Sequence, residues 1–417
     1  TEEECASLKD LPRDHVDYGA LYYEIWPILR LAYDRFKSSK KKQLLDYGTV
    51  AKFRKNQGHW LEDYVLFISL KESFGGECWL EWPSEYRDAH LAKSTELSSG
   101  VKNTADAHVF FQYIFYAQLA KLRAYAGSQG VKIMGDAPIF VALDSSDVWA
   151  NSELFQIKKN GQPKAVAGVP PDYFAEDGQL WGNPLYDWAV HEQTGFAWWI
   201  QRIKSNLEFY DIVRLDHFRG FESYWSVPAT ETTARHGRWV ACPGLELFKA
   251  LRKACPKAKL VAEDLGEITE EVNKLRTITG LPGMAVMQFA FGSEADNAYL
   301  PHNFEANCVA YSGTHDNDTS IGWYQALDGT TQDHVRRYLG VSGDAIAWDL
   351  IRATIKSSAL LAIFPLQDLM SLGSEARLNT PGAAFGNWQW RYQPHQLDQL
   401  QSDSSAYLRE YLSLYGR

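Results

Sequence analysis

Apolar residues along the first 125 positions recur with the spacing of amphipathic helices. The clearest set follows the 3.6-residue period of a helix with one buried face, and it consists of Leu21, Ile25, Ile28, Leu29, Ala32 and Phe36. Pro27 lies inside this set and indicates either the first turn of a helix that starts near Trp26 or a kink in a longer helix. A second set with the same period runs from Phe111 to Leu122. The pattern predicts a mostly helical subdomain over residues 1–125.

The pattern changes at about residue 130, where short apolar runs replace the helical period. Buried parallel strands have this appearance, and most of the runs end in a polar cluster. The runs are Val131–Met134, Ile212–Leu215, Leu260–Ala262, Ala285–Phe291, Cys308–Tyr311 and Leu360–Phe364. Two stretches between them, Gly244–Ala254 and Ile268–Ile278, have helical spacing and are predicted to connect strands.

Polar side chains that gather directly after the carboxyl ends of successive strands are typical of the active face of a TIM barrel. The sequence therefore predicts the α/β class, with a (β/α)8 TIM barrel that carries helical and loop insertions. Residues 126–417 are the predicted barrel region, although six runs are two fewer than a complete barrel has. The stretch 144–187 is too long for a simple connection and is rich in aromatic residues, so we expect a functional loop there.

The overall charge of the chain indicates which kinds of partner it can bind. The chain has 42 Lys and Arg against 52 Asp and Glu, a net charge of −10, which argues against nucleic acid because phosphate groups select basic surfaces. A neutral ligand fits this balance. Aromatic residues make up 14% of the chain, with fifteen Trp, and they predict either a large aromatic core or platforms on which the apolar faces of sugars stack.

Cysteine usage and hydropathy indicate the compartment. The five cysteines are widely spaced and form no Cys-x-x-Cys motif, so neither a disulfide framework nor a zinc site is expected, and a reducing compartment is. No apolar run approaches the length of a membrane span. We therefore expect a cytoplasmic protein that does not bind a membrane, or a protein of the plastid stroma if the source is photosynthetic. The sequence does not indicate the oligomeric state.

Asp216 follows the predicted strand 212–215. Strand alternation places Arg214 and Asp216 on the same face. A guanidinium beside a carboxylate lowers the pKa of the carboxylate and keeps it ionised, as a nucleophile that attacks a sugar requires. The alternative is a buried ion pair with a structural role.

Two further carboxylates follow predicted strands. Glu263 ends the apolar run 260–262, where loss of hydration would raise its pKa toward that of a general acid; the alternative is a carboxylate at a helix amino terminus. Asp316 lies in the turn that Gly313 permits, before a predicted helix over 321–326 that Asp318 or Thr319 caps. Retaining glycoside chemistry needs two carboxyl groups about 5 Å apart, and closure of a barrel could bring these residues to one pocket.

Short blocks that contain these residues resemble those shared by amylomaltases, the 4-α-glucanotransferases of α-glucan metabolism. They occur in order over roughly residues 10–395, and the full ordered set is far more specific than any one block. The blocks are Gly135–Val141, Gly168–Phe174, Gly178–Pro184, Arg214–Gly220, Ala262–Gly266, Gly313–Thr319, Asn379–Gly382 and Asn387–Arg391.

The resemblance implies an enzyme that transfers α-1,4-glucan segments between maltooligosaccharides by a retaining double displacement, without a metal or a cofactor. It implies that Asp216 is the nucleophile, Glu263 the acid/base and Asp316 the stabiliser of the transition state. Further residues that match the family's blocks would bind substrate: Asp136, Arg214 and His315 at the −1 sugar or the nucleophile, and Tyr173 and Trp181 in a lid on the acceptor side.

The sequence departs from the family at its amino terminus. Amylomaltases begin with two barrel strands and a Ser-Pro-Tyr type loop, and neither is found before Asp17. We therefore expect the first two strands to be missing from this chain, which begins with Thr1. Alternatives to the transferase are an α-glucan-binding protein without turnover, a hydrolase that uses water as acceptor, and a metal-dependent barrel hydrolase with His217, His315 and the carboxylates as ligands.

Overall fold

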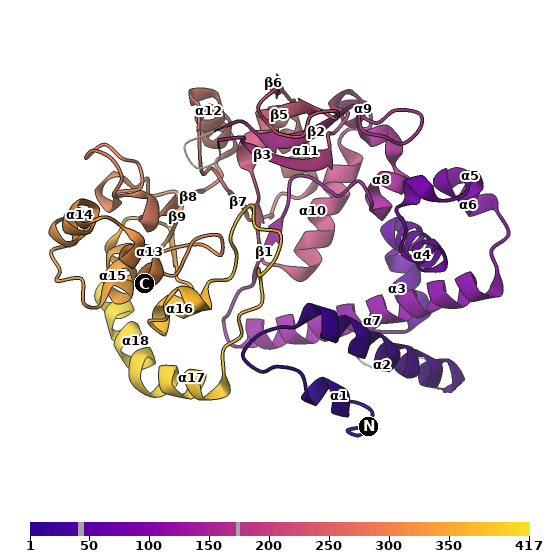
Figure 1. The fold of residues 1–417 in the computed structure, drawn as a ribbon, viewed down its shortest axis with the longest axis horizontal. Helices are drawn as coiled ribbons and strands as arrows, with labels where there is room; N and C mark the ends of the chain where they lie inside the picture. Colours follow the sequence, from indigo (N-terminus) through magenta and orange to yellow (C-terminus); the bar gives the residue numbers. More distant parts are fainter. Residues whose placement is uncertain (41–45, 172–175) are drawn as a thin grey trace. The chain divides into compact units, whose positions relative to one another are not determined.

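A computed structural model describes residues 1–40, 46–171 and 176–417, which form two compact units (Figure 1). The carboxyl-terminal unit consists of Thr1–Ile28 and Leu281–Arg417, and the central unit consists of Leu29–Gly280. Each unit contains a parallel sheet of three strands. The sequence predicts a boundary between a helical subdomain and the barrel region at residue 125. The two compact units have other boundaries and do not test it, so it stays a prediction.

The amino-terminal region is helical. Its elements are α1 (Ala6–Lys9), α2 (Tyr18–Ser38), α3 (Val50–Asn56), α4 (Gly58–Ser73), η1 (Trp79–Glu81), α5 (Ser84–Arg87), α6 (Ala89–Ser94) and α7 (Ser99–Ser128). Helix α2 begins before Pro27 and continues through it, so the predicted start near Trp26 is wrong. Proline cannot donate to the carbonyl four residues earlier, that of Tyr23, and Tyr23 is 76% exposed, so the missing hydrogen bond lies on the exposed side of the helix.

The first parallel sheet has the order β1-β4-β7 and lies in the central unit. Its strands are β1 (Met134–Ala137), β4 (Ile212–Leu215) and β7 (Leu260–Ala262). The predicted limits of β4 and β7 are confirmed, whereas the prediction of a strand over 131–134 is wrong by three residues. Val131 is exposed, whereas Gly135 belongs to the strand and pairs with Val213. A side chain larger than hydrogen would not fit at Gly135, because an added Cβ would lie 2.1 Å from the ring of Tyr210.

Helices α9 (Trp188–Gln193), α10 (Ala197–Phe209), α11 (Gly244–Ala254) and α12 (Glu270–Thr279) complete the α/β part of the central unit. Helix α10 packs against β1, β4 and α11, and α11 packs against α12. The predicted limits of α11 are confirmed, and α12 lies within two residues of its prediction.

A second sheet of the central unit is antiparallel and has the order β3-β2-β5-β6. It consists of β2 (Ala165–Val169), β3 (Gln179–Pro184), β5 (Ser223–Pro228) and β6 (Arg238–Ala241), and α8 (Ser146–Ala150) and η2 (Ser152–Leu154) precede it. The prediction of one long loop over 144–187 is therefore wrong. Strand β2 pairs with β5, about sixty positions later, and local sequence does not reveal such distant pairing.

The carboxyl-terminal unit contains the second parallel sheet, in the order β10-β9-β8. Its strands are β8 (Gly283–Val286), β9 (Cys308–Tyr311) and β10 (Leu361–Ile363). The predicted limits 285–291 are wrong for β8, although the two ranges overlap, because the chain turns into η4 (Met287–Phe289) after Val286 and buries Met287 and Phe291 in the core. The remaining elements are η5 (Pro301–Asn303), α13 (Ser320–Ala326), α14 (Gly329–Leu339), α15 (Ile346–Lys356), α16 (Leu366–Leu369), η6 (Ser374–Ala376), α17 (Pro394–Gln399), η7 (Leu400–Ser404) and α18 (Ser405–Leu414).

The six predicted parallel strands are thus present, three in each unit, and the α/β class is confirmed. Each three-stranded sheet by itself is open, so a closed barrel stays a proposal. Within the ranges that the structure describes, no helix has both the length and the apolar character of a membrane span.

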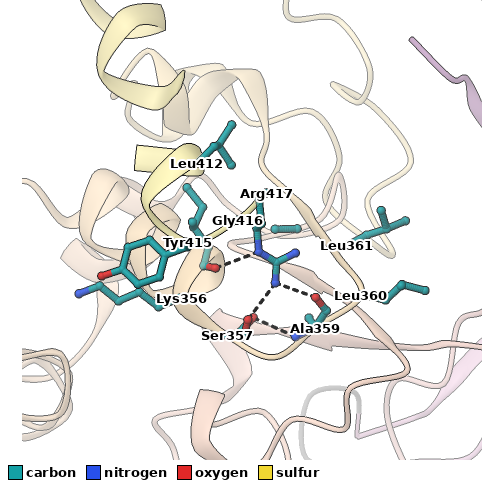
Figure 2. A pocket seen from close by; sticks show the side chains of 11 residues that line it. Lys356, Ser357, Ala359, Leu360, Leu361, Leu412, Tyr415, Gly416 and Arg417 are labelled. Carbon is teal, nitrogen blue, oxygen red and sulfur yellow. Dashed lines mark hydrogen bonds between the residues drawn. The ribbon is translucent and has the colours of Figure 1, made fainter. Parts of the chain in front are cut away.

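A cavity of about 530 Å³ lies in the carboxyl-terminal unit, between the end of α15, the start of β10 and the end of α18 (Figure 2). The guanidinium of Arg417 donates hydrogen bonds to the carbonyl oxygens of Ile355 at 2.9 Å, Ser357 at 2.9 Å and Ala359 at 2.6 Å. These contacts hold the end of α18 against α15 and the segment before β10. None of the residues predicted to act on a substrate lines this cavity.

An aromatic cluster in the central unit encloses His191, whose exposure is 0%. The rings of Tyr186, Trp188 and Trp198 lie 5.3 to 6.0 Å from it, measured between centroids. Burial lowers the pKa of His191 to about 4, because an apolar environment disfavours the charged imidazolium. The unfolded chain therefore binds a proton at His191 at a higher pH than the folded protein does.

We expect this difference to destabilise the protein in acid. As the pH falls from about 6.5 to 4, protonation of His191 in the unfolded state should lower the free energy of unfolding by about 3 kcal/mol, and the loss should level off below pH 4. The His191→Phe variant should lack this contribution in urea denaturation at pH 7, 5 and 4. Phe155→Leu is the control, since it alters the same cluster without removing a titratable group. A constant difference between wild type and His191→Phe across this range would contradict the prediction.

Candidate active site

Three charged side chains meet at the carboxyl ends of β1 and β4. The register pairs Asp136 with Arg214, and alternation along β4 places Asp216 on the face of Arg214. Arg214 Nη1 donates to both carboxylate oxygens of Asp136 at 2.8 Å and to Asp216 Oδ1 at 3.0 Å. The Arg214 side chain is 9% exposed, whereas those of Asp136 and Asp216 are 45% and 41% exposed. A buried cation thus holds two carboxylates that remain accessible to a ligand.

The electrostatics of Arg214 follow from this arrangement. Burial alone would lower its pKa, but Asp136, Asp216 and Glu263 raise the pKa overall. Arg214 therefore stays charged and gives the cluster a fixed positive centre.

Glu263 directly follows β7, the neighbour of β4 in the sheet. Its Oε2 accepts a hydrogen bond from the backbone N–H of His217 at 2.7 Å, and its Oε1 accepts one from Leu265 at 2.9 Å. Burial raises the pKa of Glu263 to about 7, and Asp216 contributes in the same direction, while Arg214 and the two N–H groups oppose it. A carboxyl group with this pKa can both give and take a proton near neutral pH.

The turn after Asp216 connects the end of β4 to Glu263 through the backbone of His217. His217 adopts φ = 49°, an uncommon left-handed conformation for a residue with a side chain. This geometry directs its backbone N–H to Glu263, and the next N–H, of Phe218, donates to the Glu263 carbonyl at 2.9 Å. The turn continues as η3 (Phe218–Phe221), whose aromatic rings are buried. The sequence indicates His217 only as an alternative metal ligand and does not predict this role of its backbone.

Trp181 of β3 lies against the same turn. Its ring meets the His217 ring edge-on, with centroids 4.9 Å apart, and it is 37% exposed. Burial lowers the pKa of His217 to about 4, so the imidazole between Trp181 and the turn is neutral. The structure thus places an exposed aromatic surface next to the residue that follows Asp216.

Asp316 lies in the carboxyl-terminal unit, on the loop that joins β9 to α13. Its Oδ1 accepts a hydrogen bond from Asn379 Nδ2 at 2.6 Å, and its Oδ2 lies 3.4 Å from His315 Nε2. Arg377 Nη2 donates to the backbone carbonyl of Asp316 at 2.9 Å. Thr319 caps α13 by accepting a hydrogen bond from Gly322 N at 3.1 Å, which decides between the two predicted caps.

A partly exposed ring also borders this loop. Trp388 lies 5.2 Å from the His315 ring, and 46% of it is exposed. Asn379, Arg377 and Trp388 are site residues that the sequence alone does not predict. The resemblance of the blocks 379–382 and 387–391 to amylomaltases was the available signal for Asn379 and Trp388.

The structure therefore describes two clusters. Asp136, Arg214, Asp216, Glu263 and Trp181 belong to the central unit, whereas His315 and Asp316 belong to the carboxyl-terminal unit. Tyr173 lies outside the described residues. No group of three or more His, Cys, Asp or Glu side chains suited to a metal ion occurs in the part of the chain that the structure describes.

The contact between Arg214 and Asp216 leads to a pH-dependent prediction. A neighbouring cation favours the ionised form of a carboxylate, so Arg214→Met should move the acidic limb of the pH–rate profile to higher pH. Loss of hydrogen bonds to charged groups, worth 1.5–3 kcal/mol, should lower kcat/KM about 10- to 100-fold. Initial rates on a maltooligosaccharide between pH 4.5 and 8 measure both effects.

The matched control for this variant is Arg123→Met. Arg123 pairs with Asp211 at 2.9 Å, next to the amino end of β4, so it tests the loss of a structural arginine close to the same strand. The control should retain the wild-type pH profile. An unchanged acidic limb in Arg214→Met would contradict the prediction.

Comparison with known proteins identifies relatives over nearly the whole chain. A family model described as 4-alpha-glucanotransferase (Glyco_hydro_77) matches residues 1–398. The 4-alpha-glucanotransferase of Thermus thermophilus is 45% identical over 394 residues, which cover 93% of this chain and 78% of that protein. The chloroplastic/amyloplastic 4-alpha-glucanotransferase of Solanum tuberosum is 43% identical over 411 residues, 98% of this chain and 71% of that protein.

A solved structure is similar in fold as well. The amylomaltase from Streptococcus agalactiae in complex with acarbose superimposes with a TM-score of 0.90 at 34% sequence identity. The match covers 97% of this chain and 81% of that one.

Proposed function

The chain belongs to the 4-alpha-glucanotransferase family, and on that premise we propose a retaining double displacement with Asp216 as nucleophile, Glu263 as acid/base and Asp316 as stabiliser of the transition state. As a member of this family it is an enzyme that transfers α-glucan segments between maltooligosaccharides. The observation that carries the assignment of roles is the arrangement around Asp216. Its carboxylate accepts a hydrogen bond from buried Arg214, and the backbone N–H of the next residue, His217, donates to Glu263, a carboxyl group with a pKa of about 7.

In the first step Asp216 attacks the anomeric carbon of an α-1,4-glucan. Glu263 donates its proton to the glycosidic oxygen, the bond between that oxygen and the anomeric carbon breaks, and a glucanosyl ester of Asp216 forms. Arg214 keeps Asp216 ionised and oriented, and Asp136 is proposed to fix Arg214 and contact the −1 sugar. The part of the donor that carries the protonated oxygen then leaves the site.

In the second step Glu263 acts as a base. It takes the proton of the 4-hydroxyl group of an acceptor sugar, whose oxygen attacks the anomeric carbon and releases Asp216. Two inversions give net retention of the α configuration. Trp181, and Tyr173 outside the described residues, are proposed to form an aromatic acceptor site that positions the sugar and excludes water.

Asp316 and His315 are proposed to bind hydroxyl groups of the same sugar as it approaches the oxocarbenium-like transition state. Asp316 has an accessible carboxylate that Asn379 and His315 orient. The finer fold assignment is likewise a proposal: the six parallel strands belong to a (β/α)8 barrel. No metal or cofactor enters these steps.

Two properties of the relatives support the substrate and the compartment. The amylomaltase from Streptococcus agalactiae binds acarbose, and we propose α-1,4-glucans as the ligands of this chain. The relative from Solanum tuberosum is chloroplastic/amyloplastic, and we propose the cytoplasm or a plastid stroma for this protein. Cys5, Cys78, Cys242 and Cys255 are free thiols, which fits a reducing compartment.

The experiment that tests this function is incubation of the purified chain with maltotriose, followed by chromatography of the products. Transfer gives glucose together with a ladder of longer maltooligosaccharides, and NMR of the new linkages should show only the α configuration. Glucose and maltose alone would indicate hydrolysis, and β linkages would contradict a double displacement.

A further inference from the structure

A buried carboxylate in the carboxyl-terminal unit connects the two ends of the loop that carries His315 and Asp316. Asp368, on α16, has an exposure of 0%. Its Oδ2 accepts hydrogen bonds from the hydroxyl groups of Ser312 and Ser320, each at 2.7 Å, and its Oδ1 accepts one from the backbone N–H of Ser320 at 2.8 Å. Ser312 directly follows β9, and Ser320 is the first residue of α13.

The topology explains why residue 368 reaches this loop. Strand β10 pairs in parallel with β9, with Ile363 opposite Tyr311, so the segments that follow the two strands leave the same edge of the sheet. Helix α16 begins three residues after β10. It brings Asp368 to Ser312, which is the first residue beyond β9.

Other residues hold the middle of the loop, whereas Asp368 binds its two ends. Gln288 Nε2 donates to the Asp318 carbonyl at 2.9 Å, and Ser374 Oγ donates to Asp318 Oδ2 at 2.7 Å. Asp316 itself is held by Asn379 and Arg377. Among these contacts, those of Asp368 join the first and the last residue of the 312–320 segment to one group.

A charged group in such a place is costly unless it is fully hydrogen-bonded. Burial raises the pKa of Asp368, and its hydrogen bonds with Ser320 and Ser312 oppose that rise. A purely apolar contact of the same size would fill this space without the cost of dehydrating a carboxylate. Unlike an apolar contact, the carboxylate fixes the relative position of two segments, because three donors from them converge on its two oxygens.

We propose that Asp368 is a positioning residue for the reaction: it closes the 312–320 loop at both ends and thereby fixes the side chain of Asp316. The inference rests on the proposed function, in which Asp316 stabilises the transition state. A displacement of about 1 Å at a catalytic group can cost about 10²-fold in rate. Loosening of the loop should therefore lower kcat more than it weakens binding of the substrate.

The test begins with Asp368→Asn, which keeps the size of the side chain but replaces one acceptor oxygen with an NH₂ group. We expect kcat on maltotriose to fall about 10- to 100-fold while KM changes by less than about threefold, as for an interaction made in the transition state. Ser320→Ala, which removes a single donor, should give a smaller loss of the same kind. Circular dichroism and Tm establish that each variant is folded at the assay temperature.

Thr354→Val is the matched control. Thr354 is equally buried in the same unit, and its hydroxyl donates to the Leu350 carbonyl of the same helix, α15, at 2.8 Å. This variant should lower Tm without changing kcat. If Thr354→Val and Asp368→Asn lower kcat alike at equal loss of Tm, the effect of Asp368 is general destabilisation and the proposal is overturned.

A double-mutant cycle separates this inference from the proposed function. In an Asp316→Asn background, Asp368→Asn should cost much less than in the wild type, because the group that it positions is already absent. Initial rates with α-maltotriosyl fluoride, a donor with a good leaving group, keep the slow variants measurable. If Asp316→Asn is impaired and the two losses multiply, only the positioning role is wrong. If Asp316→Asn retains the wild-type kcat, the proposed role of Asp316 itself is wrong.

Discussion

Replacement of Asp216 with Asn is expected to lower kcat for maltotriose disproportionation by at least about 10⁴-fold, the order of loss seen when one member of a catalytic group is removed. In the wild type Arg214 Nη1 donates to Asp216 Oδ1 at 3.0 Å. The amide oxygen of an asparagine has the same size and can still accept this hydrogen bond. It is, however, too weak a nucleophile to form a glucanosyl ester. The fold should persist because Asp216 is partly exposed and its contact with Arg214 is preserved.

Asp211→Asn is the matched control for this variant. Asp211 lies next to the other end of β4, where it accepts hydrogen bonds from Arg123 and from the backbone N–H of Ile133, both at 2.9 Å. Its substitution should lower Tm and leave kcat within a few-fold of the wild type. Near wild-type turnover in Asp216→Asn would rule out Asp216 as the nucleophile.

Replacement of Glu263 with Gln is the second change with a large expected effect. Loss of general acid–base catalysis should lower kcat by about 10²- to 10⁴-fold with maltotriose. With α-maltotriosyl fluoride the first step needs little assistance from an acid, so formation of the ester should be largely retained. Transfer to an acceptor sugar should remain slow, because no base is available to activate the 4-hydroxyl group.

The pKa of Glu263 also predicts the pH dependence of the wild type. Its pKa is raised to about 7, and the first step requires the protonated acid. As the pH rises through about 7 the acid loses its proton, so kcat/KM should fall on the alkaline side with an apparent pKa near this value. Glu263→Gln should lack this limb, since the amide does not titrate.

Asp264→Asn tests whether the limb belongs to Glu263. Asp264 is the adjacent carboxylate and pairs with Arg276 at 3.0 Å, a contact with a structural role. This variant should be less stable but should keep the alkaline limb. A limb that persists in Glu263→Gln would assign the titration to another group.

The sequence predicted best those elements whose limits follow from local composition. The runs Ile212–Leu215, Leu260–Ala262 and Cys308–Tyr311 are continuous, apolar and bounded by polar residues, and the structure confirms each as a strand. The prediction was wrong for β1, in which a glycine and an aspartate continue the strand, because pairing with β4 outweighs local preference there. The antiparallel sheet was missed because its partners are distant in the chain.

In the candidate site, too, the sequence predicts features that depend on neighbouring residues but not contacts between distant parts of the chain. The contact between Arg214 and Asp216 follows from strand alternation, and the raised pKa of Glu263 follows from its place at the end of a buried strand. By contrast, Asn379 and Asp368 reach the Asp316 loop from more than forty positions away. Only the pairing of β9 with β10 and the path of the chain after it bring these residues to the loop.

The central claim is that Asp216 forms a covalent ester with the glucan. The most direct measurement is mass spectrometry of the Glu263→Gln variant after incubation with α-maltotriosyl fluoride, followed by digestion and mapping of the modified peptide. In this variant the ester should form and persist for want of a base. The account predicts one maltotriosyl group, attached to Asp216. An adduct on another residue, or consumption of the fluoride without any adduct, would contradict it.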